Sequence, residues 1–157
     1  MEKIKAAGFT DIIVDVRPTT GDVLFNTNVV DQVKRMDVWG NSGYSYYERT
    51  ETWDYLQAFI EEARIQGLKV NASINTFVGG YLCPYNLGHD GVLFRDESKK
   101  GWASVANLAD GLTNTMDLLD DETDYGAKFF NPANDDVQNF VLQLLACLLY
   151  TSDAADD

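Results

Sequence analysis

Two short runs of β-branched residues, each preceded directly by the end of a helix, constrain the fold of this chain most. The first run is DIIVDV at 11–16, and it follows a short helical segment that Gly8 closes. The second run is LKVNASIN at 68–75, and it follows Gly67 at the end of a strongly amphipathic segment. Helices and strands that alternate with such tight joins are typical of parallel sheets. The sequence therefore predicts an α/β fold built on a parallel sheet.

Two segments carry apolar side chains at helical spacing. In residues 49–67 we expect a helix with Thr50 as its N-cap, and in residues 131–146 a helix capped by Asn134. We expect a polar loop from Pro18 to about Thr50. Residues 76–130 form a longer excursion, in which short strands are expected around 102–108 and 128–130. The two predicted apolar stripes are Trp53, Leu56, Phe59, Ile60 and Ala63, and Val137, Phe140, Val141, Leu144 and Leu145.

The two predicted strands are apolar on one face and increasingly polar on the other. Side chains alternate along a strand, so the even positions of 12–17 and 70–75 share an apolar face. An open doubly wound sheet needs apolar groups on both faces to receive helices. A (β/α)8 TIM barrel fits better, because its inward face can be polar near the mouth, where the strands end. The opposite face carries Ile13, Asp15 and Arg17 in the first strand, and Asn71, Ser73 and Asn75 in the second.

Asp15, Arg17 and Asn75 would converge near the mouth of such a barrel. One interpretation is a cluster that binds sugar hydroxyls or carboxylates, with Arg17 as donor and Asp15 as acceptor. The alternative is an Arg17–Asp15 ion pair that only fills the polar end of the barrel. Asn71 and Ser73 would lie deeper, where polar side chains more often serve as barrel filling. The residues alone leave both interpretations of Asp15 and Arg17 open.

Charge and motifs exclude several other classes of function. The chain has 12 Lys and Arg against 25 Asp and Glu, a formal charge of −13, which disfavours binding to nucleic acid or to an anionic membrane surface. No apolar run is long enough to insert in a membrane. Motifs for nucleotides, zinc or a hydrolase serine are absent. The acidic run at 117–124 lacks the spacing of a calcium-binding EF-hand and is expected to be a solvated loop, and the lone His89 is expected to be an exposed loop residue and not a catalytic one. No cofactor and no metal are predicted.

Three blocks of the sequence resemble the glycosyl-hydrolase-like family 10 proteins. They are KIKAAGFTDIIVDVRPTTGDVLF, WDYLQAFIEEARIQGLKVNASINTFVGG and FFNPANDDVQNFVLQLL. They follow one another in the family's order and spacing, and the resemblance extends over nearly all of residues 2–145. The resemblance implies a (β/α)8 barrel related to the α-amylase-type glycosidases, acting on or binding carbohydrate. It carries substrate contacts over to Arg17 and Asn75, with Asp15 just before the matching VRP motif. Many relatives have histidine and tryptophan where this chain has Asn71 and Ser73.

The resemblance also implies that residues 1–146 are about three βα units of a longer barrel. A glycosidase needs two carboxylates, and Asp15 is a candidate for at most one of them. The strand expected to carry the family's catalytic aspartate would follow Ala146, so this chain is expected to be inactive by itself. The ending CLLYTSDAADD at 147–157 resembles a translated sequencing-library adapter, with a natural acidic tail as the alternative. The function that the resemblance implies is part of a glycoside hydrolase. Two alternatives are a non-catalytic carbohydrate-binding barrel and a barrel hydrolase acting on peptidoglycan-type or deacetylated sugars.

Overall fold

The computed structural model describes residues 1–40, 43–82, 89–118 and 127–153, and at 36–40, 44, 46, 82, 89 and 151–153 it describes the backbone alone. Two 3-10 helices, at Glu97–Trp102 and Thr115–Leu118, lie within the excursion. The other elements, in chain order, are α1 (Glu2–Ala6), β1 (Asp11–Arg17), β2 (Arg35–Gly40), β3 (Gly43–Glu48), α2 (Tyr55–Ile65), β4 (Lys69–Ile74), β5 (Val78–Leu82), β6 (His89–Asp90), α3 (Val92–Arg95), β7 (Val105–Leu108), β8 (Gly111–Asn114), β9 (Ala127–Phe129) and α4 (Asp135–Asp153).

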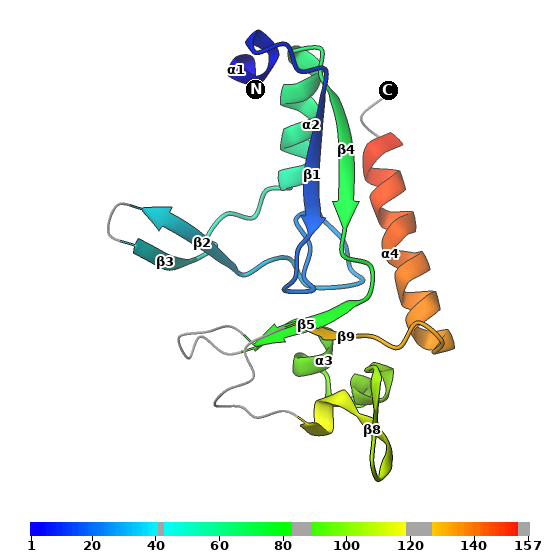
Figure 1. Ribbon diagram of the computed structural model, residues 1–157. Helices are drawn as coiled ribbons and strands as arrows, with labels where there is room; N and C mark the ends of the chain where they lie inside the picture. The colour runs from blue at the N-terminus through cyan, green and yellow to red at the C-terminus, as the bar shows by residue number, and fades with distance from the viewer. Residues whose placement is uncertain (41–42, 83–88, 119–126, 154–157) are drawn as a thin grey trace.

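The two strands predicted from the β-branched runs, β1 and β4, pair in parallel, which confirms the α/β class. Their register runs from Asp11 opposite Lys69 to Asp15 opposite Ser73, and then shifts so that Arg17 lies opposite Ile74. In Figure 1, α2 and α4 run beside this pair and in the opposite direction to its strands. The other sheets of the described residues are small and antiparallel: β2–β3, β6–β5–β9 and β7–β8.

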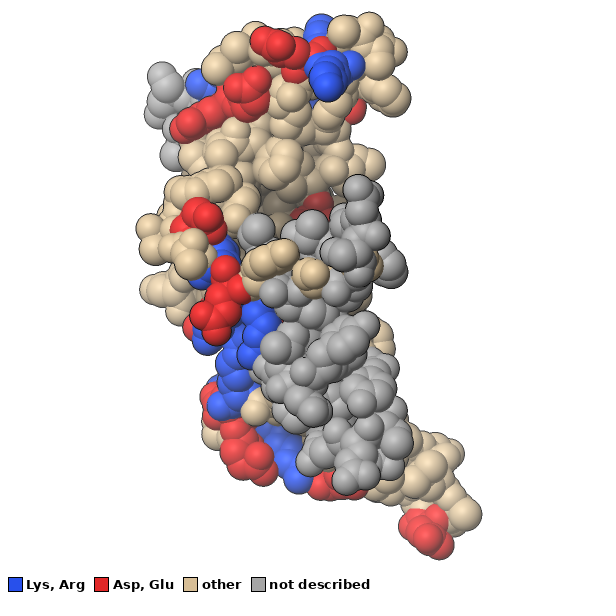
Figure 2. Space-filling model, turned by 90° about the vertical axis from the view of Figure 1, so that its left-hand side faces the viewer, with Lys and Arg blue, Asp and Glu red and all other residues tan. Residues whose placement is uncertain are grey.

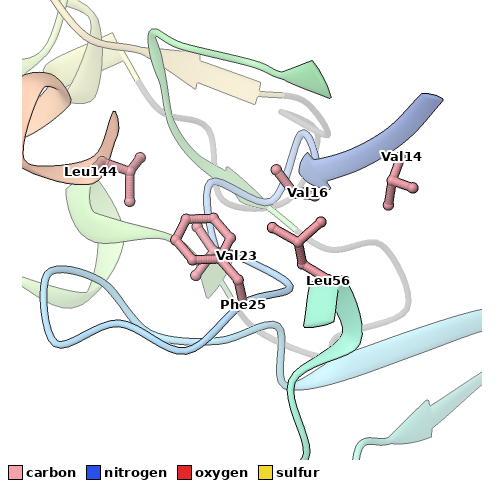
Figure 3. Close-up of a cluster of buried hydrophobic side chains, with 6 residues drawn as sticks. All are labelled: Val14, Val16, Val23, Phe25, Leu56 and Leu144. Carbon is pink, nitrogen blue, oxygen red and sulfur yellow. The ribbon is translucent and has the colours of Figure 1, made fainter. Parts of the chain in front are cut away.

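The main core lies where α2 and α4 cover the even-numbered face of β1. Val14 and Val16 from β1 pack with Leu56 from α2 and Leu144 from α4, as Figure 3 shows. Val23 and Phe25, from the segment after β1, complete this cluster and are fully buried. Full burial of such a side chain contributes roughly 1.5–3 kcal/mol. The predicted apolar face of the strand is therefore the one that the helices cover.

A second cluster joins the first half of α4 to the excursion between β4 and α4. Trp102, Phe130 and Phe140 place their ring centroids 5.6–6.0 Å apart, in the tilted and edge-to-face geometries that aromatic pairs prefer. Val137 and Val141, from the predicted stripe of α4, are buried in the same cluster. One helix therefore contributes to both cores, Leu144 to the first and Val137 to the second.

Two expectations about residues 18–54 are wrong. Part of the predicted loop is the hairpin β2–β3, because RMDVWG and GYSYYE are rich in residues that favour strands. The N-cap of α2 is Asp54 and not Thr50. Oδ1 of Asp54 accepts a hydrogen bond from the Gln57 amide at 3.0 Å, and Oδ2 accepts one from the Asn26 amide at 2.6 Å. The cap of α2 thus also holds the segment after β1.

The N-cap of α4 is Asn134, as predicted: its Oδ1 accepts hydrogen bonds from the amides of Asp136 and Val137 at 2.9 and 3.2 Å. The helix continues past Ala146 to Asp153, and Cys147 and Leu148 pack, partly buried, against the main core. Among the described helices, none combines the length and the apolarity that crossing a bilayer requires.

Candidate functional site

The carboxyl ends of β1 and β4 bring two of the three predicted site residues together. Nδ2 of Asn75 lies 3.5 Å from Oδ2 of Asp15 and donates a hydrogen bond of 3.0 Å to the carbonyl of Arg17. The backbone amide of Asn75 donates to the same carbonyl at 3.1 Å. Asp15 is exposed and Asn75 half-buried. The end of β1 therefore fixes the Asn75 carboxamide beside an accessible carboxylate.

Arg17, the third predicted residue, lies in the interior. Its side chain has no exposed surface, and its guanidinium donates to the carbonyls of Asn75, Thr76 and Val78, the last at 2.5 Å. Within the described residues Arg17 forms no ion pair with Asp15, and its buried Nε has no hydrogen-bond partner. Burial lowers the pKa of Arg17 to about 10, against the opposing effect of Asp22. Arg17 therefore clamps the turn after β4.

The register shift between Asp15 and Arg17 explains this difference from simple alternation. A bulge adds a residue to one strand, so the side chains that follow it change face. Asp15 remains on the open, odd-numbered face of the sheet, together with Asn71 and Ser73, which are exposed. Ile13 on the same face is 78% exposed. The face opposite α2 and α4 is therefore uncovered, and it carries polar groups toward the strand ends.

A network of charges around two buried carboxylates, below the strand ends, was not predicted from the sequence. Arg95 donates to Asp22 from its two terminal nitrogens, Nη1 and Nη2, at 2.9 and 2.7 Å. It also donates to Asp31 at 2.9 Å and to Asp90 at 2.8 Å. Arg35 lies 3.2 Å from the other oxygen of Asp90. The side chains of Asp22 and Asp90 are 1% and 6% exposed. The network ties the segment after β1 to β2, β6 and α3.

No local motif reveals this network, because Arg95 and Asp22 stand 73 positions apart. The signal that the sequence does contain is a set of acids within an otherwise apolar stretch, Asp22 in GDVLF and Asp90 in HDGVLF. An acid among residues of that kind needs a buried partner. On the face drawn in Figure 2, lysine and arginine side chains lie between groups of aspartate and glutamate.

Burial raises the pKa of Asp22 to about 6, and the hydrogen bonds and charge of Arg95 oppose this shift. At a pH between 3.8, the ordinary pKa of an aspartate, and about 6, Asp22 is largely protonated in the folded chain and largely ionised in the unfolded chain. The stability contributed by this group is therefore fully present below about pH 4 and is lost as the pH rises through about 6.

We therefore expect the free energy of unfolding of the wild type, relative to Asp22→Asn, to fall as the pH rises from 4 to 6.5. The slope is at most about 1.4 kcal/mol per pH unit, because one proton is exchanged. Urea unfolding of both proteins across this range measures the difference. A difference that rises with pH would show that pairing with Arg95 outweighs burial.

Two further predicted features lie partly outside the description. The backbone of His89 belongs to β6, but its side chain is not described, and most of the acidic run, residues 119–124, lies outside the described ranges. Within 1–40, 43–82, 89–118 and 127–153, no three His, Cys, Asp or Glu residues are grouped so as to hold a metal ion.

The strand-end site consists of Asp15, Asn71, Ser73 and Asn75 on an open face, with Arg17 behind the turn. The Asp15 carboxylate and the Asn75 amide oxygen are hydrogen-bond acceptors at this site, and the Asn75 Nδ2 already donates to Asp15 and to the Arg17 carbonyl. Comparison of the chain with protein-family models and with curated proteins gives no match.

Proposed function

We propose that the strand-end site binds carbohydrate and that the chain forms part of a glycoside-hydrolase-like (β/α)8 barrel. The observation that supports this most is the fixed pairing of Asp15 with Asn75 at the carboxyl ends of two parallel strands. Sugar hydroxyls donate and accept hydrogen bonds at once. The Asp15 carboxylate and the Asn75 amide oxygen can accept hydrogen bonds from sugar hydroxyls, while the Asn75 Nδ2 donates to Asp15 and to the Arg17 carbonyl.

The arrangement of layers supports the barrel. In a (β/α)8 barrel each strand is followed by a helix on the outside, and functional groups gather where the strands end. Here α2 and α4 lie on one face of β1 and β4, and the other face is open. Ile13, 78% exposed, is a large apolar side chain on that open face, and the interior of a barrel would bury it.

Hydrolysis of a glycosidic bond requires two carboxyl groups about 5–10 Å apart. At the ends of β1 and β4, among the described residues, Asp15 is the carboxylate on the open face. The proposed hydrolase therefore needs a second carboxylate from another strand. The presence of a single carboxylate here equally favours a second candidate function, a barrel that binds carbohydrate without cleaving it.

Replacing Asp15 with asparagine tests the proposed site. A charge-assisted hydrogen bond contributes about 1.5–3 kcal/mol, so we expect the affinity for a bound neutral oligosaccharide to fall about tenfold or more. Because Asp15 is exposed, the melting temperature should change little. Titration of cellopentaose, chitopentaose and maltopentaose, followed by NMR, measures the affinity.

The matched control is Asp11→Asn, which changes an exposed carboxylate at the other end of the same strand. It should leave the affinity unchanged. Equal losses in the two variants would assign the effect to overall charge and overturn the site. If none of the three sugars perturbs the resonances of Asp15 or Asn75, the proposal is also overturned.

A further inference from the structure

A second cleft lies away from the strand-end site. Its volume is about 750 Å³, within the range of small-molecule sites, and its walls are the segment 28–31, α3 with the 3-10 helix that follows it, and the first half of α4. Neither Asp15 nor Asn75 lines it. Figure 1 shows α3 and the start of α4 below the carboxyl ends of β1 and β4.

One wall of this α4 cleft is a polar stripe on the helix. Asp136, Asn139 and Gln143 follow one another at intervals of three and four residues, so they share one side of α4. All three are exposed. Asn28 is exposed on the segment 28–31. Within the described part of the chain, the carboxamides of Asn28, Asn139 and Gln143 form no hydrogen bond with the protein.

Most charged groups of the cleft are already paired with protein groups. Arg95 is bound to Asp22, Asp31 and Asp90, and Asp96 accepts hydrogen bonds from the amide and hydroxyl of Ser98. The groups left for a ligand are therefore mainly carboxamides. A carboxamide donates and accepts with no net charge, which suits neutral hydroxyl groups better than phosphate or carboxylate.

The cleft also has aromatic carbon on its lining. Phe140 and the half-buried Trp102 lie with ring centroids 5.6 Å apart, and the Lys99 ammonium stands 4.2 Å from the Trp102 ring centroid. Lys99 therefore covers one face of the Trp102 ring, and Phe140 is buried, so these side chains are packed within the protein. Because Arg95 bridges Asp31 on one wall to Asp22 and Asp90, that wall is held in place before a ligand arrives.

We propose that the α4 cleft is a second binding site, specific for neutral oligosaccharides. The assignment rests on the residues of the cleft and does not require the strand-end site to bind sugar. Asn28, Asn139 and Gln143 would bind hydroxyl groups from opposite walls of the cleft.

NMR titration of the whole chain with cellopentaose, chitopentaose and maltopentaose tests this proposal. We expect at least one of the three to shift the side-chain amides of Asn139 and Gln143 and the indole N–H of Trp102. The double variant Asn139→Ala/Gln143→Ala should weaken that binding at least tenfold. Its matched control is Gln138→Ala on the same helix, a residue that does not line the cleft, and this variant should bind as the wild type does.

Asp15→Asn separates this site from the strand-end site. We expect the shifts at Asn139 and Gln143 to survive in that variant with unchanged affinity. Binding that Asp15→Asn abolishes and the double variant retains would overturn the second site while supporting the first. No shift at the cleft with any of the three sugars, or a shift with trigalacturonate alone, would overturn the assignment to neutral oligosaccharides.

Discussion

Replacing Arg17 with alanine is expected to lower the free energy of unfolding by about 3–5 kcal/mol. The guanidinium is fully buried, and it is the donor to the carbonyls of Asn75, Thr76 and Val78. Removing it leaves buried acceptors without a donor and a cavity where the side chain was. Urea denaturation followed by circular dichroism measures the loss.

Arg17→Lys sharpens this test, because it keeps the charge and most of the apolar stem. One ammonium cannot reproduce the planar fork that meets several carbonyls, so much of the loss should remain. Lys3→Ala, which removes a cation from the exposed helix α1, is the control and should be nearly neutral. Unchanged stability in Arg17→Ala, combined with weakened oligosaccharide binding, would show instead that the guanidinium contacts the ligand.

Gly91→Ala is expected to be at least as damaging, with a loss of about 4 kcal/mol or more. Gly91 has φ +94°, a conformation that L-residues rarely adopt. A Cβ there would collide with the Cα of Gly80 and lie 2.7 Å from the Thr20 carbonyl oxygen and 2.8 Å from that of Gly79. These are backbone atoms of two other segments, so no side chain can move aside to make room.

Gly111→Ala is the matched control for Gly91→Ala. Gly111 also has a positive φ, +115°, but nothing lies within 4 Å of the position where its Cβ would stand. This variant should lose only about 1–2 kcal/mol, the cost of the backbone conformation. Equal losses in the two variants, measured by urea denaturation, would show that the close approach around Gly91 contributes nothing.

The parts of the fold that the sequence predicts correctly are those specified by local pattern. The strands at 11–16 and 68–75 follow from β-branched residues bounded by glycine, and α4 follows from its apolar spacing and Asn134. The hairpin β2–β3 carried a comparable signal in its tyrosines, valine and tryptophan. Because many polar residues surround that segment, the sequence analysis predicts a loop there.

The parts of the site that the sequence does not predict depend on contacts between distant residues. Alternation places Arg17 beside Asp15, but one register shift turns it into the interior. The pairing of Asp22 with Arg95 forms only when the segment after β1 meets α3. The N-cap of α2 fails as a prediction for a related reason: Asp54, unlike Thr50, also binds the amide of Asn26.

The two hydrogen bonds that Asp54 accepts link the fraying of α2 to the opening of the segment after β1. The same carboxylate receives the Gln57 amide of the helix and the Asn26 amide of a segment 28 positions earlier. Fraying of the first turn of α2 therefore also removes the acceptor of the Asn26 amide, and a shift of Asn26 withdraws one of the two amides that hold the cap. We expect local unfolding of the first turn of α2 and of the segment around Asn26 to be coupled through this carboxylate.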